Sequence, residues 1–283
     1  MTNKKFTHTF HPIDGKAIAE DILLKIRKKI VESGITPGLA VIMIGNDEPS
    51  KLYVRNKKKA CLKVGIDFHT YFCEKETENQ IIEMITFLNN DPAVSGIIVQ
   101  LPLPERFNTQ KIIDAIDPKK DADGFHPKNL KNILAGKSTT YPPLVQTVLR
   151  ILNNEKINMS KKTVALLSHS QVFCPIMVKA LENNGAQTKI IELQDAKALK
   201  EADIVIVALG KPGCLTGDMI KKDAVVIDIG ITKTNMGFTG DADFKSISKI
   251  ASMATPTPGG VGPVTVAMLL QSTLDLTENS SPS

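Results

Sequence analysis

The first half of the chain alternates between two patterns of apolar residues. Between Asp14 and Glu32 an isoleucine recurs at every fourth position, from Ile18 to Ile30, which predicts an amphipathic helix. The run LAVIMIG from Leu39 to Gly45 is apolar throughout and is typical of a strand buried on both faces. The alternation continues with a predicted helix from about Ser50 to Val64, a strand at Ile66–Cys73, a helix at Glu78–Asn89 and a strand at Val94–Pro104 that ends in a proline-rich turn. Strands joined by crossover helices predict a parallel sheet.

A second alternating series begins near Lys161. Its expected elements are strands at Thr163–Leu167, Thr188–Leu193, Asp203–Gly210 and Ala224–Gly230, a helix at Cys174–Asn184 and a short helix before Asp203. A loop rich in proline and glycine then leads into a last helix, and the tail from Glu278 to Ser283 is expected to be disordered. The chain is therefore predicted to be an α/β protein of two lobes, divided near residues 140 to 150.

Composition and charge narrow the class of partner. The 283 residues are 42% hydrophobic and 23% charged, which is ordinary for a globular protein long enough to form two domains. The net charge of +5 comes from scattered basic residues, whereas a nucleic-acid-binding protein usually gathers them on one face. No nucleic-acid partner is expected, and a small anionic substrate fits the charge equally well.

The cysteines and the apolar runs bear on compartment and metal. Four cysteines lie far apart without paired spacing, so neither a metal site nor a disulfide framework is predicted. No run of 18 apolar residues is present and the first residues are polar, so the sequence predicts no membrane span and no signal peptide. A cytoplasmic protein without a membrane partner is expected.

The helix SKLYVRNKKKACLKVGI contains the first candidate for chemistry. At about 100° per residue, Tyr53, Lys57, Ala60 and Val64 fall within one arc of about 60°. The other basic residues of this helix point elsewhere, which leaves Lys57 as its one cation on the apolar face. Such a lysine either extends to water as a structural residue, or has a pKa lowered by burial and exchanges protons near neutral pH. Spacing alone leaves both interpretations open.

Two further stretches add polar groups. The strand GIIVQ ends with Gln100, an amide able to donate to or accept from a buried amine, and parallel strands present functional residues at their carboxyl ends. The segment KKDADGFHP places Asp121 and Asp123 in a turn before a glycine. A carboxylate in a cleft is a good acceptor for an amidine-like pair of N–H groups, although D-A-D-G is also a common turn with no site.

Four short motifs stand in a fixed order along the chain. They are S-x-x-Y-x-x-x-K at Ser50–Lys57, V-Q-L-P-L-P at Val99–Pro104, K-D-x-D-G at Lys120–Gly124 and T-P-x-P-G-G-V-G-P-x-T at Thr255–Thr265. Between the last two lie G-K-P-G, V-I-D-I-G-I and G-D-A-D-F. Together they resemble the bifunctional methylenetetrahydrofolate dehydrogenase/methenyltetrahydrofolate cyclohydrolase family. Four motifs in order are far more specific than any one of them.

The resemblance implies an architecture and an activity. It implies an N-terminal folate-binding catalytic lobe at residues 1–145, a Rossmann-like lobe with a parallel sheet at 146–263, and a C-terminal helix, 264–277, that returns to the first lobe. It implies hydrolysis of 5,10-methenyltetrahydrofolate to 10-formyltetrahydrofolate and NADP-dependent oxidation of 5,10-methylenetetrahydrofolate, without a metal. A homodimer, a folate site in the cleft between the lobes and a place in one-carbon metabolism and purine biosynthesis are also implied.

The resemblance also assigns roles to residues. Lys57 is expected to manage the proton beside the one-carbon bridge, and Gln100 to hydrogen-bond Lys57 and set its protonation. Tyr53 is expected to stack on the aminobenzoyl group, and Asp123 to bind the pterin through its amino group and N3–H. The other substrate-binding positions that it implies are Val54, Arg55, Asn56, Val99, Leu101, Pro258, Gly259, Gly260, Val261 and Gly262.

The nucleotide-binding turn departs from the family's pattern. That turn reads roughly G-R-S-x-x-V-G-x-P, and counting back from Pro175 this chain has LSHSQVFC. Both glycines are replaced, by Leu167 and Phe173, and Ser168 stands at the arginine position. Side chains then stand where a pyrophosphate needs backbone, so NADP is expected to bind poorly. The remaining candidate cofactor contacts are Leu167, Ser168, His169 and Ile231.

Glu192 is a second departure, after the next predicted strand. The family usually carries a cysteine-histidine-serine type of segment there, near the NADP ribose, and an acid would repel a 2′-phosphate or accept a ribose hydroxyl of NAD. Three hypotheses follow: a cyclohydrolase with weakened or lost dehydrogenase activity, a fully bifunctional enzyme with a rearranged turn, and a folate-binding pseudoenzyme or partner of another family member. The lysine constellation favours the first two over the third, and the altered turn favours the first over the second.

Overall fold

The computed structural model describes residues 9–235 and 237–280, which form two compact units. The lysine unit, named for Lys57, contains residues 19–146 and 265–280. The six-stranded unit contains residues 9–18 and 147–264. Residues 265–280 are thus grouped with the first half of the chain, although they are the last that the structure describes.

Three parallel strands in the order β3-β2-β4 form the sheet of the lysine unit. Its elements are α1 (Gly15–Ser33), β2 (Gly38–Ile44), α2 (Glu48–Val64), β3 (Asp67–Cys73), α3 (Glu78–Asn90), β4 (Gly96–Gln100), α4 (Thr109–Asp114), α5 (Pro127–Leu134) and α10 (Val261–Ser280), the first residues of α1 and α10 being grouped with the other unit. All of β2 is buried, because helices cover both faces of the central strand, as its continuous apolar run predicts.

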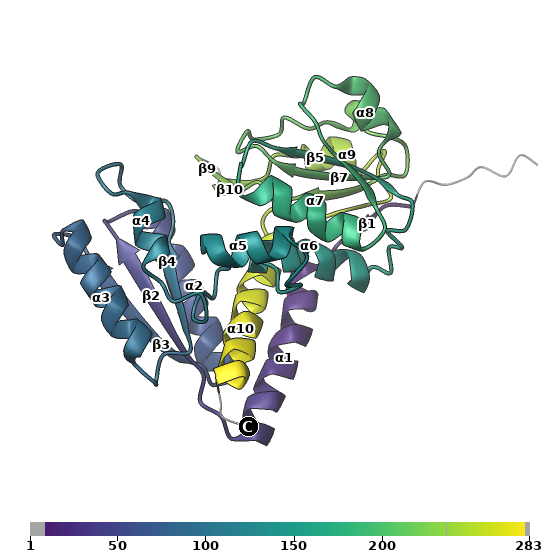
Figure 1. The fold of residues 1–283 in the computed structure, drawn as a ribbon. Helices are drawn as coiled ribbons and strands as arrows, with labels where there is room; N and C mark the ends of the chain where they lie inside the picture. Colours follow the sequence, from purple (N-terminus) through teal and green to yellow (C-terminus); the bar gives the residue numbers. More distant parts are fainter. Residues whose placement is uncertain (1–8, 236, 281–283) are drawn as a thin grey trace, which may run out of the picture. The chain divides into compact units, whose positions relative to one another are not determined.

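Helix α10 completes the core of the lysine unit. It lies alongside α1 (Figure 1), and Lys29 of α1 pairs with Glu278 of α10 at 2.6 Å. A Cβ added at Gly96, the first residue of β4, would lie 3.6 Å from Cγ2 of Thr273, so α10 also reaches the sheet. Gln146 and Ser272 share a hydrogen bond of 3.2 Å.

Six parallel strands form the main sheet of the other unit, within the part of the chain that the structure describes. Its elements are β1 (His11–Pro12), α6 (Pro143–Asn154), β5 (Thr163–Ser168), α7 (Phe173–Asn183), β6 (Gln187–Ile190), α8 (Ala196–Glu201), β7 (Ile204–Ala208), η1 (Gly217–Met219), β8 (Val225–Asp228), β9 (Thr232–Thr234), β10 (Gly237–Thr239), α9 (Phe244–Ile247) and β11 (Met253–Ala254), the first residues of α6 being grouped with the lysine unit. The sheet order is β1-β11-β8-β7-β5-β6. The connections reverse direction between β5 and β7, where doubly wound sheets open a ligand crevice at their carboxyl ends.

The α/β class, the parallel strands and most predicted elements are confirmed within two residues of their expected ends. Three features differ. Strand β1 pairs with β11 in the six-stranded sheet, whereas the expected division placed residues 1–145 in the first lobe. The β9–β10 hairpin and the short helices between residues 109 and 154 were not predicted. Helix α10 extends to Ser280, so residues 278–280 are helical rather than disordered, and residues 281–283 lie outside the described part.

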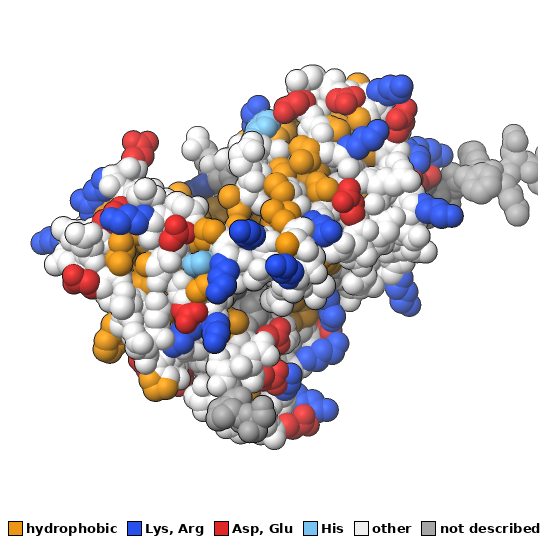
Figure 2. Space-filling view, viewed as in Figure 1, with side chains coloured by type: hydrophobic (Ala, Val, Ile, Leu, Met, Phe, Trp, Pro, Cys, Tyr) orange, Lys and Arg blue, Asp and Glu red, His pale blue; other side chains and the backbone are white. Residues whose placement is uncertain are grey.

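The surface agrees with the scattered charge of the sequence. On the face shown in Figure 2, Lys and Arg side chains are interspersed with Asp and Glu side chains rather than gathered in one patch. No helix among residues 9–235 and 237–280 is both long and apolar enough to cross a membrane.

Candidate functional site

Helix α2 positions the candidate lysine. The Asp47 side chain caps the helix by accepting from the N–H of Ser50 at 2.8 Å, so the helix begins at Glu48, two residues before its expected start. Val54, Cys61 and Val64 form its buried face, and Lys57 lies half-buried at the edge of that face. The prediction that Lys57 faces inward is therefore confirmed.

Gln100 meets Lys57 from the neighbouring strand. Lys57 Nζ donates to Gln100 Oε1 at 3.0 Å, and Gln100 Nε2 donates to the carbonyl of Leu101 at 2.8 Å. The second bond fixes which end of the amide faces the lysine, because a reversed amide would set two donors against each other. The expected hydrogen bond between these two residues is present, at the carboxyl end of β4.

The charges of Lys57 and Asp123 are coupled. Burial lowers the pKa of Lys57, and the negative charge of Asp123 opposes that shift. Burial raises the pKa of Asp123, Lys57 opposes this, and Asp121 adds to it. The pKa of the lysine is lowered and that of the carboxyl group is raised. Each group therefore gains or loses its proton closer to neutral pH than an ordinary lysine or aspartate does.

Asp121 and Asp123 have different environments, although only Ala122 separates them in the sequence. Asp121 Oδ1 accepts from the N–H of Gly124 at 2.9 Å and Oδ2 accepts from that of His126 at 2.8 Å. Asn129 Nδ2 donates to Asp121 Oδ2 at 2.9 Å. For Asp123, no hydrogen-bond donor among the described residues lies within bonding distance of the carboxylate. The hydrogen bonds of Asp121 therefore fix the conformation of the loop, whereas the carboxylate oxygens of Asp123 remain able to accept hydrogen bonds from a ligand.

Two neighbours fix the loop that carries these aspartates. Lys120 Nζ donates to the carbonyls of Leu88 and Asp91, at 3.1 and 2.7 Å, which ties the loop to the end of α3. Gly124 has a φ of +73°, and a Cβ there would lie 2.9 Å from Cα of Pro142. Only glycine satisfies both conditions, which explains the last letter of the K-D-x-D-G motif.

A narrow pocket adjoins Asp123. It is lined by apolar residues of β4 and α4, by Phe125, and by both Asp121 and Asp123. Leu101, at its margin, is 36% exposed. The volume of this pocket is only about 10 Å³, too small for a heteroaromatic ring, so it shows the apolar surroundings of the two carboxylates.

The other expected folate contacts fall into two groups. Tyr53 is half-buried one helical turn before Lys57, and burial raises the pKa of its phenol; Arg55 and Asn56 are exposed. The side chains of Val54 and Val99 are buried, so only their backbone is available for contact.

The Pro258–Gly262 segment belongs to the six-stranded unit. A Cβ at Gly260 would lie 2.6 Å from the carbonyl of Pro256, so glycine is required there by packing. Pro258 and Gly262 are exposed, Gly259 is half-buried, and the side chain of Val261 is buried.

The turn after β5 differs from its expected form. β5 extends to Ser168, and Leu167 lies inside the strand with 0% exposure, in the core of the six-stranded unit. Phe173 is 8% exposed as the first residue of α7. Leu167 therefore belongs to the strand and not to the turn, which corrects its expected place, and Phe173 is buried at the start of α7. Residues 168–173 also contain no positive φ.

At this turn, serine hydroxyl groups accept hydrogen bonds from backbone N–H groups. Ser168 Oγ accepts from the N–H of Ser170 at 3.3 Å, and Ser170 Oγ accepts from the N–H of Phe173 at 3.1 Å. Backbone N–H groups at a helix N-terminus are what usually binds a pyrophosphate in this fold. The N–H of Phe173, at the start of α7, and that of Ser170, just before the helix, are therefore bonded to serine hydroxyls, which compete with a pyrophosphate for these two donors.

The other candidate cofactor contacts are exposed. His169 Nδ1 lies 3.8 Å from Glu192 Oε1, with side chains that are 57% and 59% exposed. Ile231, 44% exposed, follows β8 in the sequence.

Two buried carboxylates organise the loops after β7 and β8. Asp228 accepts from the N–H groups of Gly230, Asp241 and Ala242, at 2.9, 3.1 and 2.9 Å. Asp241 Oδ2 accepts from the N–H groups of Leu209 and Gly210, at 2.6 and 2.9 Å. Burial raises the pKa of Asp228 to about 6, and the charge of Asp241 adds to the shift.

These structural roles were missed at the level of sequence. The aspartates of V-I-D-I-G and G-D-A-D-F, between an apolar strand and a glycine, were the available signal.

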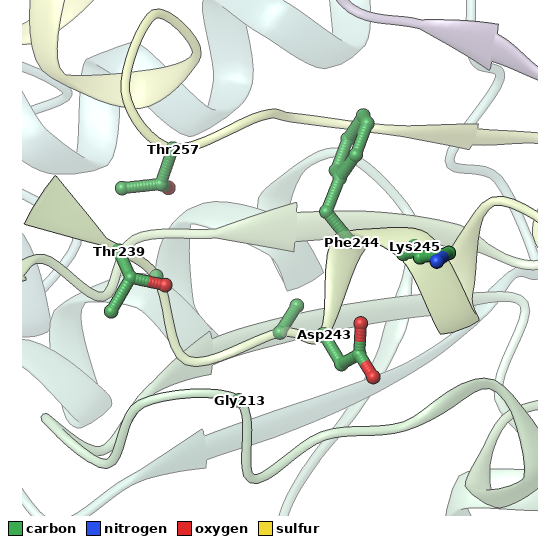
Figure 3. A pocket seen from close by; sticks show the side chains of 8 residues that line it. Gly213, Thr239, Asp243, Phe244, Lys245 and Thr257 are labelled. Carbon is green, nitrogen blue, oxygen red and sulfur yellow. The ribbon is translucent and has the colours of Figure 1, made fainter. Parts of the chain in front are cut away.

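A larger pocket, of about 380 Å³, adjoins these loops. Thr239, Thr257, Asp243 and Phe244 surround it (Figure 3). Neither Lys57 nor the turn at residues 168–173 lines this pocket. Among the described residues, no group of three or more His, Cys, Asp or Glu side chains is arranged to hold a metal ion.

Comparison with known families gives two matches that together span most of the chain. Residues 13–123 match the tetrahydrofolate dehydrogenase/cyclohydrolase catalytic domain, and residues 142–281 match the NAD(P)-binding domain of the same family. The bifunctional protein FolD of Nautilia profundicola is 42% identical over 275 residues, covering 94% of this chain and 97% of that protein. FolD of Staphylococcus aureus strain Newman is 39% identical over 270 residues, covering 93% and 94% of the two chains.

Solved structures agree with these matches. The crystal structure of the bifunctional FolD enzyme from Campylobacter jejuni has a TM-score of 0.92 and 34% identity, and covers 96% of this chain and 100% of that one. The Trypanosoma brucei enzyme, solved in complex with NADP cofactor and an inhibitor, has a TM-score of 0.91 and 30% identity, and covers 97% and 99% of the two chains.

Proposed function

Because the chain belongs to the tetrahydrofolate dehydrogenase/cyclohydrolase family, we propose that it hydrolyses 5,10-methenyltetrahydrofolate to 10-formyltetrahydrofolate. The observation that carries the proposal is the 3.0 Å hydrogen bond between Lys57 Nζ and Gln100 Oε1. It joins a half-buried amine with a lowered pKa to a neutral acceptor whose orientation is fixed. A lysine that only extended to water would show neither feature.

Lys57 handles a proton in the proposed reaction. Water adds to the carbon between N5 and N10 of the methenyl cation, and the amine form of Lys57 accepts one proton of that water. The bond from this carbon to N5 then breaks, N5 keeps the electron pair and takes the second proton, and the carbon becomes the formyl group on N10. Lys57 passes its proton to solvent, so one proton is released per substrate. Gln100 holds the amine, and Asp123 accepts from the pterin ring.

A second proposal concerns the dehydrogenase activity that is part of the family's description and of the name of the Campylobacter jejuni enzyme. We propose that dehydrogenase activity with NADP is weakened in this chain. The support is the turn after β5, where serine hydroxyls take the N–H groups of Ser170 and Phe173. A nicotinamide cofactor, where bound, would supply hydride acceptance. Two of the turn's backbone donors are not available to its phosphates unless a serine hydroxyl is displaced. The fully bifunctional enzyme remains the competing candidate, because both family domains are present.

The test of the hydrolase proposal is Lys57→Met with Lys58→Met as its matched control. Both changes remove one ammonium from α2, but Lys58 is exposed and Lys57 is not. We expect Lys57→Met to abolish hydrolysis of 5,10-methenyltetrahydrofolate, followed by absorbance, while folate binding measured by calorimetry is retained. Lys58→Met should keep the parent rate. If Lys57→Met hydrolysed the substrate at the parent rate, Lys57 would have only a structural role and the proposed proton transfer would be wrong.

Further assignments rest on the resemblance alone. We propose that the protein is a cytoplasmic homodimer whose 10-formyl product serves purine biosynthesis. Sedimentation velocity at micromolar concentration tests the dimer, and a single species with the 30.8 kDa mass of one chain would contradict it.

A further inference from the structure

Glu192 stands at the carboxyl end of the strand that neighbours the altered turn. In the parallel pairing of β5 and β6, Leu166 is the partner of Ile190, and the N–H of Ile191 donates to the carbonyl of Leu166 at 3.0 Å. Two residues beyond that pair the chain has Ser168 on one side and Glu192 on the other. Since adjacent strands lie about 4.8 Å apart, Glu192 begins directly beside the turn.

The carboxylate of Glu192 is directed across the end of β5. Its Oε1 lies 3.8 Å from Nδ1 of His169, the residue that follows β5. Both side chains are more than half exposed, so a ligand can reach them and the pair itself contributes little to stability. His169 follows β5 and Glu192 follows β6, so both lie at the carboxyl ends of these two neighbouring strands, a place called the β5–β6 corner below.

In doubly wound sheets that bind dinucleotides, residues at this position recognise the adenosine ribose of the cofactor. An acidic residue after the second strand of the β-α-β unit, some 20 residues beyond the first turn, accepts hydrogen bonds from the adenosine ribose of NAD. An arginine nearby instead accommodates the 2′-phosphate of NADP. Here β5, α7 and β6 form the unit, and Glu192 has the acidic position.

Arginine is missing from this part of the chain. The last arginine of the sequence is Arg150, in α6, before β5 begins. No guanidinium in the sequence after that point can form the paired hydrogen bonds that usually hold a 2′-phosphate. A 2′-phosphate would instead meet the like charge of Glu192. The residues present do not fit NADP at the β5–β6 corner.

We propose that the dinucleotide accepted by the six-stranded unit is NAD rather than NADP, and that Glu192 is the residue that selects it. The inference rests on the family's use of a nicotinamide cofactor and is independent of the hydrolysis assigned to Lys57. A weak pyrophosphate site and a selective ribose site are compatible, because the turn sets overall affinity and Glu192 sets the difference between the two nucleotides.

The experiment measures binding without folate. Dissociation constants for NAD and NADP are obtained by titration of the ¹⁵N-labelled full chain, at low ionic strength because exposed charges are screened by salt. The parent is compared with Glu192→Gln and Glu192→Asp. Glu182→Gln is the matched control, since Glu182 is exposed near the far end of α7 and carries the same charge.

We expect the parent to bind NAD at least about tenfold more tightly than NADP, a difference that like-charge repulsion readily supplies. Glu192→Gln should reduce that ratio about tenfold, mainly by tighter NADP binding. Glu192→Asp and Glu182→Gln should keep it. Equal or tighter NADP binding by the parent, an unchanged ratio in Glu192→Gln, or no binding of either nucleotide would each overturn the inference. Loss of hydrolase activity would not, because the titration contains no folate.

Discussion

Gln100 holds the amine of Lys57 from one fixed side. Its Oε1 accepts from Lys57 Nζ at 3.0 Å, while its Nε2 is engaged by the carbonyl of Leu101 at 2.8 Å. The amide therefore cannot rotate to donate to the lysine without losing its own partner. The neutral oxygen of Gln100 stabilises the ammonium form, against the burial that destabilises it.

Substitutions at Gln100 should move the pKa of Lys57 in opposite directions. Gln100→Leu removes the acceptor and should lower the pKa further, so the rise of kcat/KM for methenyl hydrolysis with pH moves to lower pH. Gln100→Glu adds a negative charge and should move that rise to higher pH. The measurement is the pH profile of hydrolysis for the three proteins. A shift in the same direction for both variants would show that Gln100 does not act through the lysine.

Asp123 is expected to bind folate at a cost to stability. Its carboxylate is half-buried, receives no hydrogen bond from the described residues and has a pKa raised by desolvation, so Asp123→Asn should leave the free energy of unfolding unchanged or higher. The same change places an amide N–H against the pterin N–H groups and should weaken folate binding by about 1–3 kcal/mol, more than Asp123→Glu does. Calorimetry and urea denaturation measure the two effects. Equal folate affinity in all three proteins would place the pterin elsewhere.

Asp121 should behave in the opposite way. Asp121→Asn replaces one acceptor oxygen by a donor that faces backbone N–H groups or Asn129. We expect a loss of about 1–3 kcal/mol in the free energy of unfolding, with folate affinity falling only because the loop is displaced. If Asp121→Asn were as stable as the parent, these hydrogen bonds would not organise the loop.

Introducing glycine at Leu167 should not restore nucleotide binding. The side chain is 0% exposed in the core, so Leu167→Gly should leave a cavity and cost roughly 3–5 kcal/mol. Val172→Gly is the control, because Val172 is 42% exposed in the same turn and its loss opens no cavity. Urea denaturation and titration with NADP measure both effects. Tighter NADP binding by Leu167→Gly would show that the strand ends before Leu167 in solution.

Asp228 should make the six-stranded unit less stable as pH rises. Its pKa is about 6 in the folded protein against an ordinary value of 3.8, so between these values the folded chain retains a proton that the unfolded chain has released. The stabilising contribution is complete below the lower value and is lost as pH rises through 6, a change of roughly 3 kcal/mol. Asp228→Asn does not titrate, and the stability of the parent relative to this variant should fall between pH 4 and 7. A constant difference would contradict the shift.

The sequence predicted the chemistry of the lysine unit better than that of the six-stranded unit. Lys57 was identified because the helical period makes it the one cation of α2 on the apolar face, and Gln100 because it ends an apolar strand. The different environments of Asp121 and Asp123 could not be predicted, since they depend on which backbone N–H groups the loop directs at each carboxylate.

The turn after β5 shows a second limit. Counting residues back from Pro175 assigned Leu167 to the turn, but β5 is one residue longer, and the register with β7 pairs Ser168 with Ala208. Spacing in a sequence does not show where a strand ends when the residues beyond it are neither glycine nor proline. The strand β1 was missed for a related reason, because its two residues pair with a segment more than 200 positions away.

The grouping of α10 with the first half of the chain has a consequence for synthesis on the ribosome. Residues 19–146, which include Lys57 and Gln100, are translated long before residues 265–280, yet Thr273 and Ser272 pack against Gly96 and Gln146. The lysine unit therefore cannot complete its core while the nascent chain is still emerging, whereas most of the six-stranded unit is translated before α10. A premature stop in α10 would damage the half of the protein that was made first.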